Sequence, residues 1–201
     1  MPELARNRFD QAITRFDEEN AKDPNIEIAD GQPRPRELLY AIRLTNWVER
    51  LTPNASEELL LAARCQHLCR WMIPRTQYEM TKPGYLKWRN DLKKFHAAKS
   101  GEILTAVGYP DETIQKVQAL NLKKNFPGDP ESRILEDALC LVFLQYQLTD
   151  LAARTEEDKV VNALQKSWNK MSEPGRAAAL ALDHTPVEKA LLQKALQPKG
   201  A

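Results

Sequence analysis

The sequence predicts an all-α protein, a single-domain bundle of about eight helices. Apolar residues recur every three or four positions, no stretch alternates long enough to suggest a sheet, and only seven glycines interrupt the pattern. A capping residue followed by proline marks helix starts at Thr52-Pro53, Asp129-Pro130 and Thr185-Pro186. A chain of 201 residues suits one domain with a substantial core.

The helices follow from these signals in chain order. The first is charged and amphipathic, the one from residue 84 carries an aromatic stripe, the one from residue 130 a leucine stripe, and the last begins with a capping box closed by Glu188. We expect them at residues 3–21, 36–51, 56–72, 84–107, 111–124, 130–154, 156–171, 173–182 and 186–196. Residues 23–35 and 73–83 are expected to be irregular. The domain is expected to span residues 1–201, with residues 156–201 as a C-terminal helical subdomain packed on the core.

Charge is balanced over the whole chain but not along it. The formal net charge is +1, yet the segment from Arg64 to Lys99 holds nine basic residues against two acidic ones, a local charge of +7. The same segment contains aromatic residues, among them Tyr78, Tyr85 and Trp88. This combination favours a phosphorylated small molecule or a nucleotide as ligand, with RNA as a weaker alternative. The other interpretation of the lysines is a solvated surface without a ligand.

No apolar run approaches the ~20 residues of a membrane span, and the N-terminus lacks a signal-peptide core. Three cysteines are too few and too sparse for a disulfide framework, which fits a reducing compartment. The sequence therefore predicts a cytoplasmic protein with no membrane partner.

Three ionisable side chains fall on the apolar stripes of separate predicted helices: His67, His96 and Asp137. Asp137 continues the stripe of Ile134 and Leu141, so its carboxylate occupies a core position. Burying such groups without partners costs several kcal/mol, so we expect the three to converge on each other, a metal or a ligand. The alternatives are histidines that only make the core rigid, and an ion pair of Asp137 with an arginine. The candidate arginines are Arg64, Arg70 and Arg89.

Imidazoles and a carboxylate on different helices can form a metal cage. His67, His96 and Asp137 are the predicted ligands of a divalent ion (Mn, Fe, Mg or Zn), and Glu136 is the predicted catalytic group that assists proton transfer. The basic and aromatic segment supplies the predicted phosphate- or ligand-binding residues, which are Arg70, Arg75, Tyr78 and Arg89.

The order His67, His96, Glu136-Asp137 resembles the HD-domain superfamily of metal-dependent phosphohydrolases, an all-helical family that carries a His, a His-Asp doublet and a later Asp. Twenty-nine positions separate the two histidines and 41 separate His96 from Asp137, which suits that pattern. The doublet differs, because Ala97 stands where that family has its carboxylate. The resemblance implies an HD-like bundle and metal-dependent hydrolysis.

A closer resemblance covers nearly the whole chain. The stretches 63–71, 74–78, 84–89, 95–97 and 135–144 are similar to a domain-of-unknown-function family of bacteria and fungi, some fungal members of which carry a glutamyl-tRNA synthetase label. This chain has no nucleotide-binding strand with a glycine loop and is too short for a synthetase core.

The sequence thus favours a metal-dependent phosphohydrolase, or a degenerate relative, that acts on a phosphorylated small molecule or nucleotide. The alternatives are a non-catalytic nucleotide- or RNA-binding module and a helical interaction protein. Metal content separates the first from the others.

Overall fold

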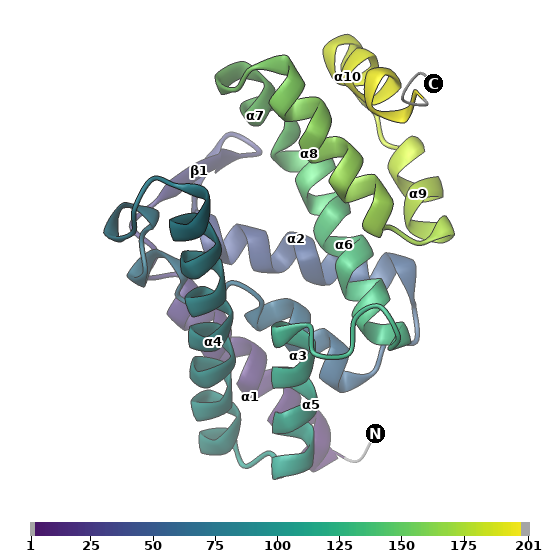
Figure 1. Ribbon diagram of the computed structural model, residues 1–201. Coiled ribbons are helices and arrows are strands. Elements are labelled where there is room, and N and C mark those ends of the chain that lie inside the picture. The colour runs from purple at the N-terminus through teal and green to yellow at the C-terminus, as the bar shows by residue number, and fades with distance from the viewer. Residues whose placement is uncertain (1–2, 198–201) are drawn as a thin grey trace. The chain divides into compact units, whose positions relative to one another are not determined.

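The computed structural model describes the backbone of residues 3–197 and the side chains of residues 7–197. Helices dominate it, as predicted (Figure 1). The α-helices are α1 (Glu3–Asn20), α2 (Arg36–Leu51), α3 (Glu57–Cys65), α4 (Lys82–Val107), α5 (Asp111–Leu122), α6 (Pro130–Tyr146), α7 (Leu148–Arg154), α8 (Glu157–Lys170), α9 (Glu173–Leu180) and α10 (Pro186–Leu196). Two 3-10 turns, η1 (Arg70–Met72) and η2 (Arg75–Gln77), lie between α3 and α4.

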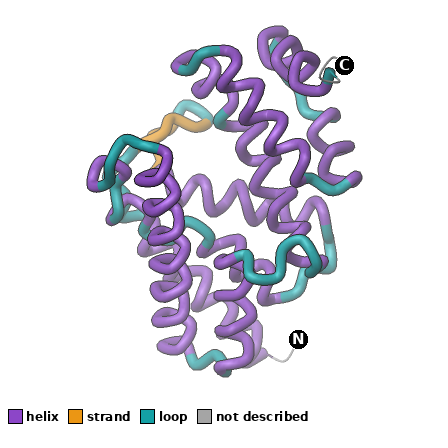
Figure 2. The backbone as a smooth tube through the Cα atoms, in the orientation of Figure 1, coloured by secondary structure: helices purple, strands orange, loops and turns teal. Residues whose placement is uncertain are grey.

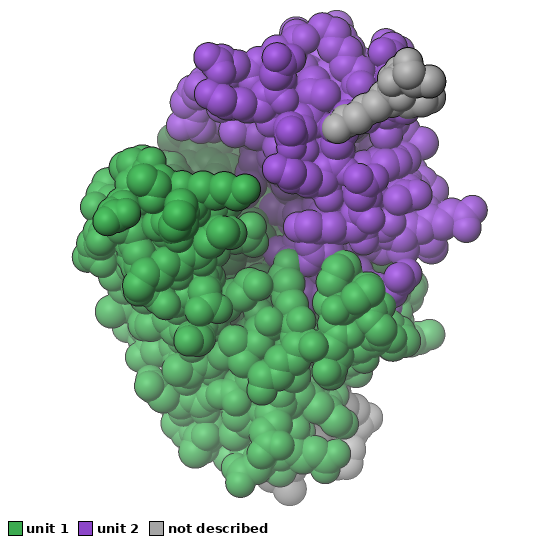
Figure 3. Space-filling model, viewed as in Figure 1, with its two compact units in different colours: residues 1–132 green, residues 133–201 purple. Residues whose placement is uncertain are grey.

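The chain divides into two compact units, residues 1–132 and 133–201 (Figure 3). The expected C-terminal subdomain, residues 156–201, lies inside the second unit, which begins earlier, within α6. Residues 1–2 and 198–201 of the expected domain ranges lie outside the described part of the chain.

In the first unit, α3 is the central helix. It packs against α1, α2 and α5, while α4 packs against α1 and α5. Leucines on three of these helices are fully buried, because their apolar positions recur at helical spacing. They include Leu44, Leu59, Leu61 and Leu104. This core fixes the ends of α2 and α3 relative to α4, where the candidate site lies.

In the second unit, α8 packs against α7 and α10. The capping box expected at the start of the last helix is present, since the Thr185 side chain accepts from the Glu188 backbone and Glu188 bonds back to the Thr185 N–H. No described helix is long and apolar enough to cross a membrane.

Three sequence expectations were wrong about local structure. The segment 23–35 is not irregular throughout, because it contains an antiparallel hairpin of β1 (Ile26–Ala29) and β2 (Gln32–Pro35), drawn in orange in Figure 2. The helix expected over residues 56–72 ends at Cys65, and the helix expected over residues 130–154 is interrupted at Gln147.

These differences have local causes. The hairpin turns at Asp30 and Gly31, both with positive φ, and Asp-Gly is a favoured pair for a two-residue turn. After α3, Cys69 adopts a left-handed conformation with φ of 55°, which no helix can continue through. The backbone N–H of Cys69 is held there by the side-chain oxygen of Asn20, at 3.1 Å.

Candidate functional site

Two of the three predicted site groups meet in the first unit. His67 lies in the turn after α3 and His96 lies in α4, and their ring centroids are 5.8 Å apart. His96 is buried at 3% exposure, whereas the His67 side chain keeps 26% of its surface. Of the three groups predicted to converge, the two histidines lie close together, and the convergence of Asp137 with them stays a prediction.

Each histidine uses its Nδ1 atom to contact an acceptor. The Nδ1 of His96 lies 2.8 Å from the carbonyl oxygen of Leu68, and a carbonyl can only accept, so this Nδ1 carries the proton. The Nδ1 of His67 lies 3.3 Å from Oε2 of Glu37. Since that carboxylate is also an acceptor, His67 donates through Nδ1 as well. In both neutral rings the lone pair is therefore on Nε2.

The electrostatics keep both rings neutral. Burial lowers the pKa of His67, and the nearby charges of Arg70 and Lys123 lower it further, so the Glu37 carboxylate restores it only in part. Burial lowers the pKa of His96 to about 3, and the neighbouring imidazole of His67 acts in the same direction whenever it is protonated. At neutral pH the site thus offers two unprotonated Nε2 atoms.

Glu37 was missed by the sequence prediction. It lies in the first turn of α2, with a side chain only 6% exposed, and its Oε1 is 3.5 Å from a guanidinium nitrogen of Arg70. Burial raises the pKa of Glu37, but the hydrogen bond from His67 and the charge of Arg70 bring it below its ordinary value. The carboxylate is therefore ionised at neutral pH.

Aromatic rings complete the cluster. Tyr40, one turn after Glu37, stacks on His67 with ring centroids 4.0 Å apart and an angle of 12° between the planes. The guanidinium of Arg70 lies over Trp88, 5.0 Å from the ring centroid, and the Trp88 indole donates to the Ile73 carbonyl at 2.8 Å. We call Glu37, Tyr40, His67, Arg70, Trp88 and His96 the histidine cluster.

Asp137 belongs to the second unit, and its carboxylate has partners there. It accepts from the backbone N–H of Ser172, at 2.8 Å, and from the Ser172 hydroxyl. Arg64 pairs with Asp17 at 2.7 Å and Arg70 with Glu37 inside the first unit. An ion pair of Asp137 with Arg64, Arg70 or Arg89 stays an alternative from the sequence. The role of Asp137 as a metal ligand stays a prediction.

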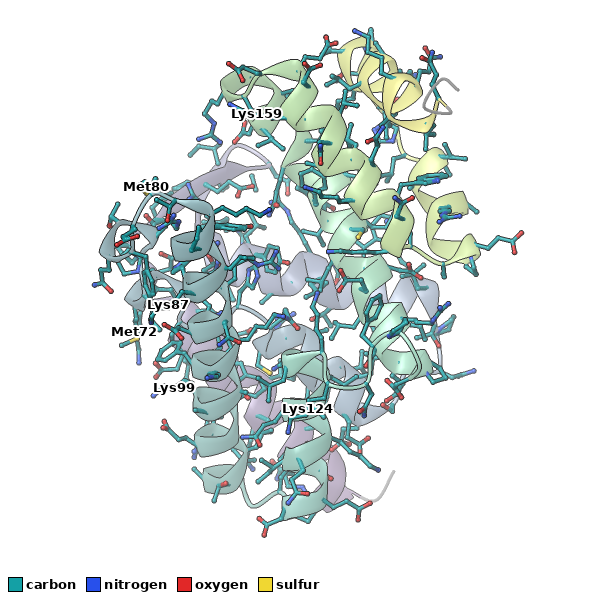
Figure 4. All side chains as sticks on the ribbon, viewed as in Figure 1. Met72, Met80, Lys87, Lys99, Lys124 and Lys159 are labelled. Atoms are coloured by element: carbon teal, nitrogen blue, oxygen red, sulfur yellow. The ribbon has the colours of Figure 1, made fainter. Side chains whose placement is uncertain are left out.

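The remaining predicted residues also have partners of their own. Glu136, buried in α6, lies 3.3 Å from the ammonium of Lys170. The Arg75 guanidinium donates to backbone carbonyls of its own loop, and the Tyr78 hydroxyl donates to Asp91 at 3.1 Å. Asp91 also pairs at 2.7 Å with Lys87. Figure 4 labels Lys87 on α4. Their predicted catalytic and phosphate-binding roles stay predictions.

Arg89 stands apart from the loop. It is exposed on α4, and its guanidinium lies over the Tyr85 ring, 5.9 Å from the centroid. It is more exposed than the other members of the predicted phosphate-binding set, Arg70, Arg75 and Tyr78. Its predicted role likewise stays a prediction.

A divalent ion fits the donors in part. Two imidazoles that share an ion through Nε2, at metal–nitrogen distances of ~2.0–2.1 Å, have ring centroids roughly 5–6 Å apart, which agrees with the spacing of His67 and His96. Histidines that ligate metals regularly donate their other N–H to a carboxylate or a carbonyl, as both do here. Within the described residues, however, no three His, Cys, Asp or Glu side chains gather as ligands.

The fold and the histidine cluster define an all-α protein whose first unit joins two neutral imidazoles, a carboxylate and an arginine. The chain belongs to the family described as Domain of unknown function (DUF4202), whose model matches residues 10–192. The comparisons with curated proteins and with solved structures gave no match.

Proposed function

We propose that this chain is a metal-dependent phosphohydrolase that acts on a phosphorylated small molecule such as a nucleotide, with the histidine cluster as its site. One observation carries the proposal: both histidines donate through Nδ1 to fixed acceptors, which leaves Nε2 unprotonated in each, and their ring centroids lie 5.8 Å apart. Imidazole nitrogen suits Fe or Zn better than Mg or Mn.

In this proposal the histidines bind the metal ion and Arg70 binds the phosphate. His67 and His96 would hold the ion through Nε2, and an ion bound there supplies a water of lowered pKa and neutralises phosphate charge. Arg70 would bind phosphate oxygens, because its planar guanidinium matches them in geometry and its side chain is 34% exposed. Trp88 supports the guanidinium from one face.

The second candidate is a non-catalytic phosphate- or nucleotide-binding module. It is favoured by the lack of a three-residue ligand group among the described residues and by Ala97 at the position of the doublet carboxylate. The same Arg70 would then bind the phosphate without a metal. Roles in RNA binding or as a helical interaction protein stay predictions from the sequence.

Metal binding by purified protein tests the first proposal. Calorimetric titration with Mn²⁺ and Zn²⁺ is expected to give one site in the wild type and none in His67→Gln or His96→Gln, each checked for folding by circular dichroism. His184→Gln is the matched control, because His184 is also buried but uses Nε2 to contact the Ala179 carbonyl, at 2.9 Å. This variant is expected to bind the ion like the wild type.

A phosphate-release screen of nucleotides and sugar phosphates with the bound ion then tests catalysis. Turnover that disappears in His67→Gln supports the hydrolase. A wild type that binds no ion would refute it. Heat stabilisation by phosphate or a nucleotide without any ion would favour the binding module instead, since a ligand of the native state raises the melting temperature.

A further inference from the structure

We propose that Glu37 is a positioning residue with opposite effects on its two partners in the histidine cluster. It raises the affinity of His67 for a metal ion, and it lowers the affinity of Arg70 for an anion. The proposal rests on the function proposed above and adds a control of ligand affinity that the sequence prediction did not contain. It follows from the fixed place of one buried carboxylate between two different partners.

Glu37 is held firmly by its backbone. Its N–H donates to Oδ2 of Asp23 at 3.0 Å, and the preceding N–H, of Arg36, donates to the Asn25 carbonyl at 2.9 Å. Asp23 is itself 3% exposed and accepts from the Asn25 backbone and side chain through Oδ1. The start of α2 is thereby fixed, and the carboxylate of Glu37 has a defined direction.

One carboxylate oxygen of Glu37 determines which neutral tautomer His67 adopts. An imidazole has two neutral tautomers, and the partner of one nitrogen decides which of them carries the proton. Oε2 lies 3.3 Å from Nδ1 and requires a donor there, while Tyr40 stacks flat on the ring and limits its rotation. The amide of a glutamine in place of the carboxylate could either accept from Nδ1 or donate to it, so Nδ1 would no longer have to carry the proton and the Nε2 lone pair would no longer be guaranteed.

The other oxygen of Glu37 lowers the attraction of Arg70 for anions. Oε1 lies 3.5 Å from the guanidinium, and a buried negative charge at that distance opposes any phosphate that approaches Arg70. Removal of the charge leaves the guanidinium uncompensated. Phosphate should then bind more tightly, even though His67 and His96 bind the metal ion less tightly.

The test compares Glu37→Gln with the wild type, and Glu188→Gln serves as control. Glu188 is a buried carboxylate of the second unit whose Oε2 lies 3.9 Å from Nδ1 of His184, and glutamine is also accepted in its capping box. In Glu37→Gln we expect Zn²⁺ affinity to fall by roughly 10–100-fold, as for other outer-shell partners of metal-binding histidines. Affinity for inorganic phosphate should rise in the same variant, and both affinities should be unchanged in Glu188→Gln.

Opposite signs are the diagnostic result. A loss of both affinities would show that Glu37 only supports the fold and would overturn the proposal. So would an unchanged affinity for both probes.

Nitrogen NMR of the histidines tests the proposal without a metal or any activity. In the wild type, His67 and His96 should be protonated at Nδ1 and His184 at Nε2, and Glu37→Gln should shift only His67 towards a mixture. A wild-type His67 protonated at Nε2 would refute the role of Glu37 even if the variant fails to fold. Should the wild type bind no ion, the phosphohydrolase fails, while the tautomer and the phosphate affinity still decide the role of Glu37.

Discussion

Asp137 accepts two hydrogen bonds from a single residue, Ser172: one from its backbone N–H, at 2.8 Å, and one from its hydroxyl. The Ser172 oxygen in turn accepts from the N–H of Gly175, at 3.3 Å, as the N-cap of α9. The buried carboxylate of α6 thus ties that helix to the start of α9 inside the second unit. The polar partner of this buried Asp137 is therefore Ser172, the N-cap residue of α9.

Gly175→Ala is expected to destabilise the protein by about 1–3 kcal/mol, as overpacking of a fixed contact does. A Cβ at this position would lie 2.5 Å from Oδ1 of Asp137, whose carboxylate cannot withdraw without losing Ser172. Helix propensity alone predicts the opposite sign, because Ala is favoured over Gly in helices by about 1 kcal/mol. Urea unfolding measures the difference. Ala177→Gly, at an exposed site of the same helix, is the control and should cost about 1 kcal/mol.

Stability should fall as the pH is lowered from 6.5 towards 3. His96 has a pKa of about 3 in the folded chain against 6.5 in the unfolded one, so between these values only the unfolded chain takes up the proton. This linkage costs about 1.4 kcal/mol per pH unit, is absent above pH 6.5, and is reinforced by the lowered pKa values of His67 and Glu37. Urea unfolding at pH 7, 6 and 5 should give a shallower dependence for His96→Gln. Equal slopes in the two proteins would contradict the burial of a neutral His96.

Arg75→Ala should loosen the loop between η2 and α4. The guanidinium donates to the carbonyls of Tyr78, at 2.9 Å, Glu79, at 2.5 Å, and Thr81, at 3.3 Å, so one side chain binds three carbonyls of the irregular backbone. Chymotrypsin should cleave after Tyr78 several-fold faster in this variant than in the wild type or in Arg89→Ala. Phosphate affinity should remain within about twofold of the wild type, since the site proposed here uses Arg70. A tenfold loss of phosphate affinity with an intact loop would instead support the phosphate-binding role predicted from the sequence.

Asp23→Ala should cost about 1–2 kcal/mol, the usual price of a lost helix cap. Pro35 precedes α2 and offers no side-chain acceptor, so Asp23 satisfies the Glu37 N–H from twelve residues upstream of Pro35. Asp23→Asn keeps one acceptor oxygen and should lose less. Asp10→Ala, exposed on α1, is the control. Urea unfolding of the four proteins decides between these expectations.

The sequence was sufficient to predict the helices and the close approach of His67 and His96, because a polar group on an apolar stripe is buried and needs a polar partner. The same logic applied to α2 would have found Glu37, which continues the stripe of Ala41, Leu44 and Val48. It was not sufficient to predict the partner of Asp137. The bond from Ser172 joins residues 35 positions apart and leaves no periodic signal, and an apolar stripe indicates that Asp137 is buried but not which residue it contacts.

Breaks in the helices were harder to predict for a related reason. Cys69 adopts a left-handed conformation, which glycine or asparagine usually occupies at the end of a helix. Here the conformation is held by a hydrogen bond to Asn20, 49 residues away. Periodicity continues across the break and so predicts one helix. The hairpin at residues 26–35 was signalled by Asp30-Gly31, but its strands have four residues each, too few for alternation to be recognised.

The hairpin can grow in only one direction. Its hydrogen-bonded pairs must be Glu27 with Arg34 and Ala29 with Gln32, because Pro33 and Pro35 have no N–H to give. The outer side of β2 therefore offers carbonyls without donors, while the outer side of β1 keeps both. An added strand can join β1 alone, so pairing between copies would stop at two and could not propagate into a fibre.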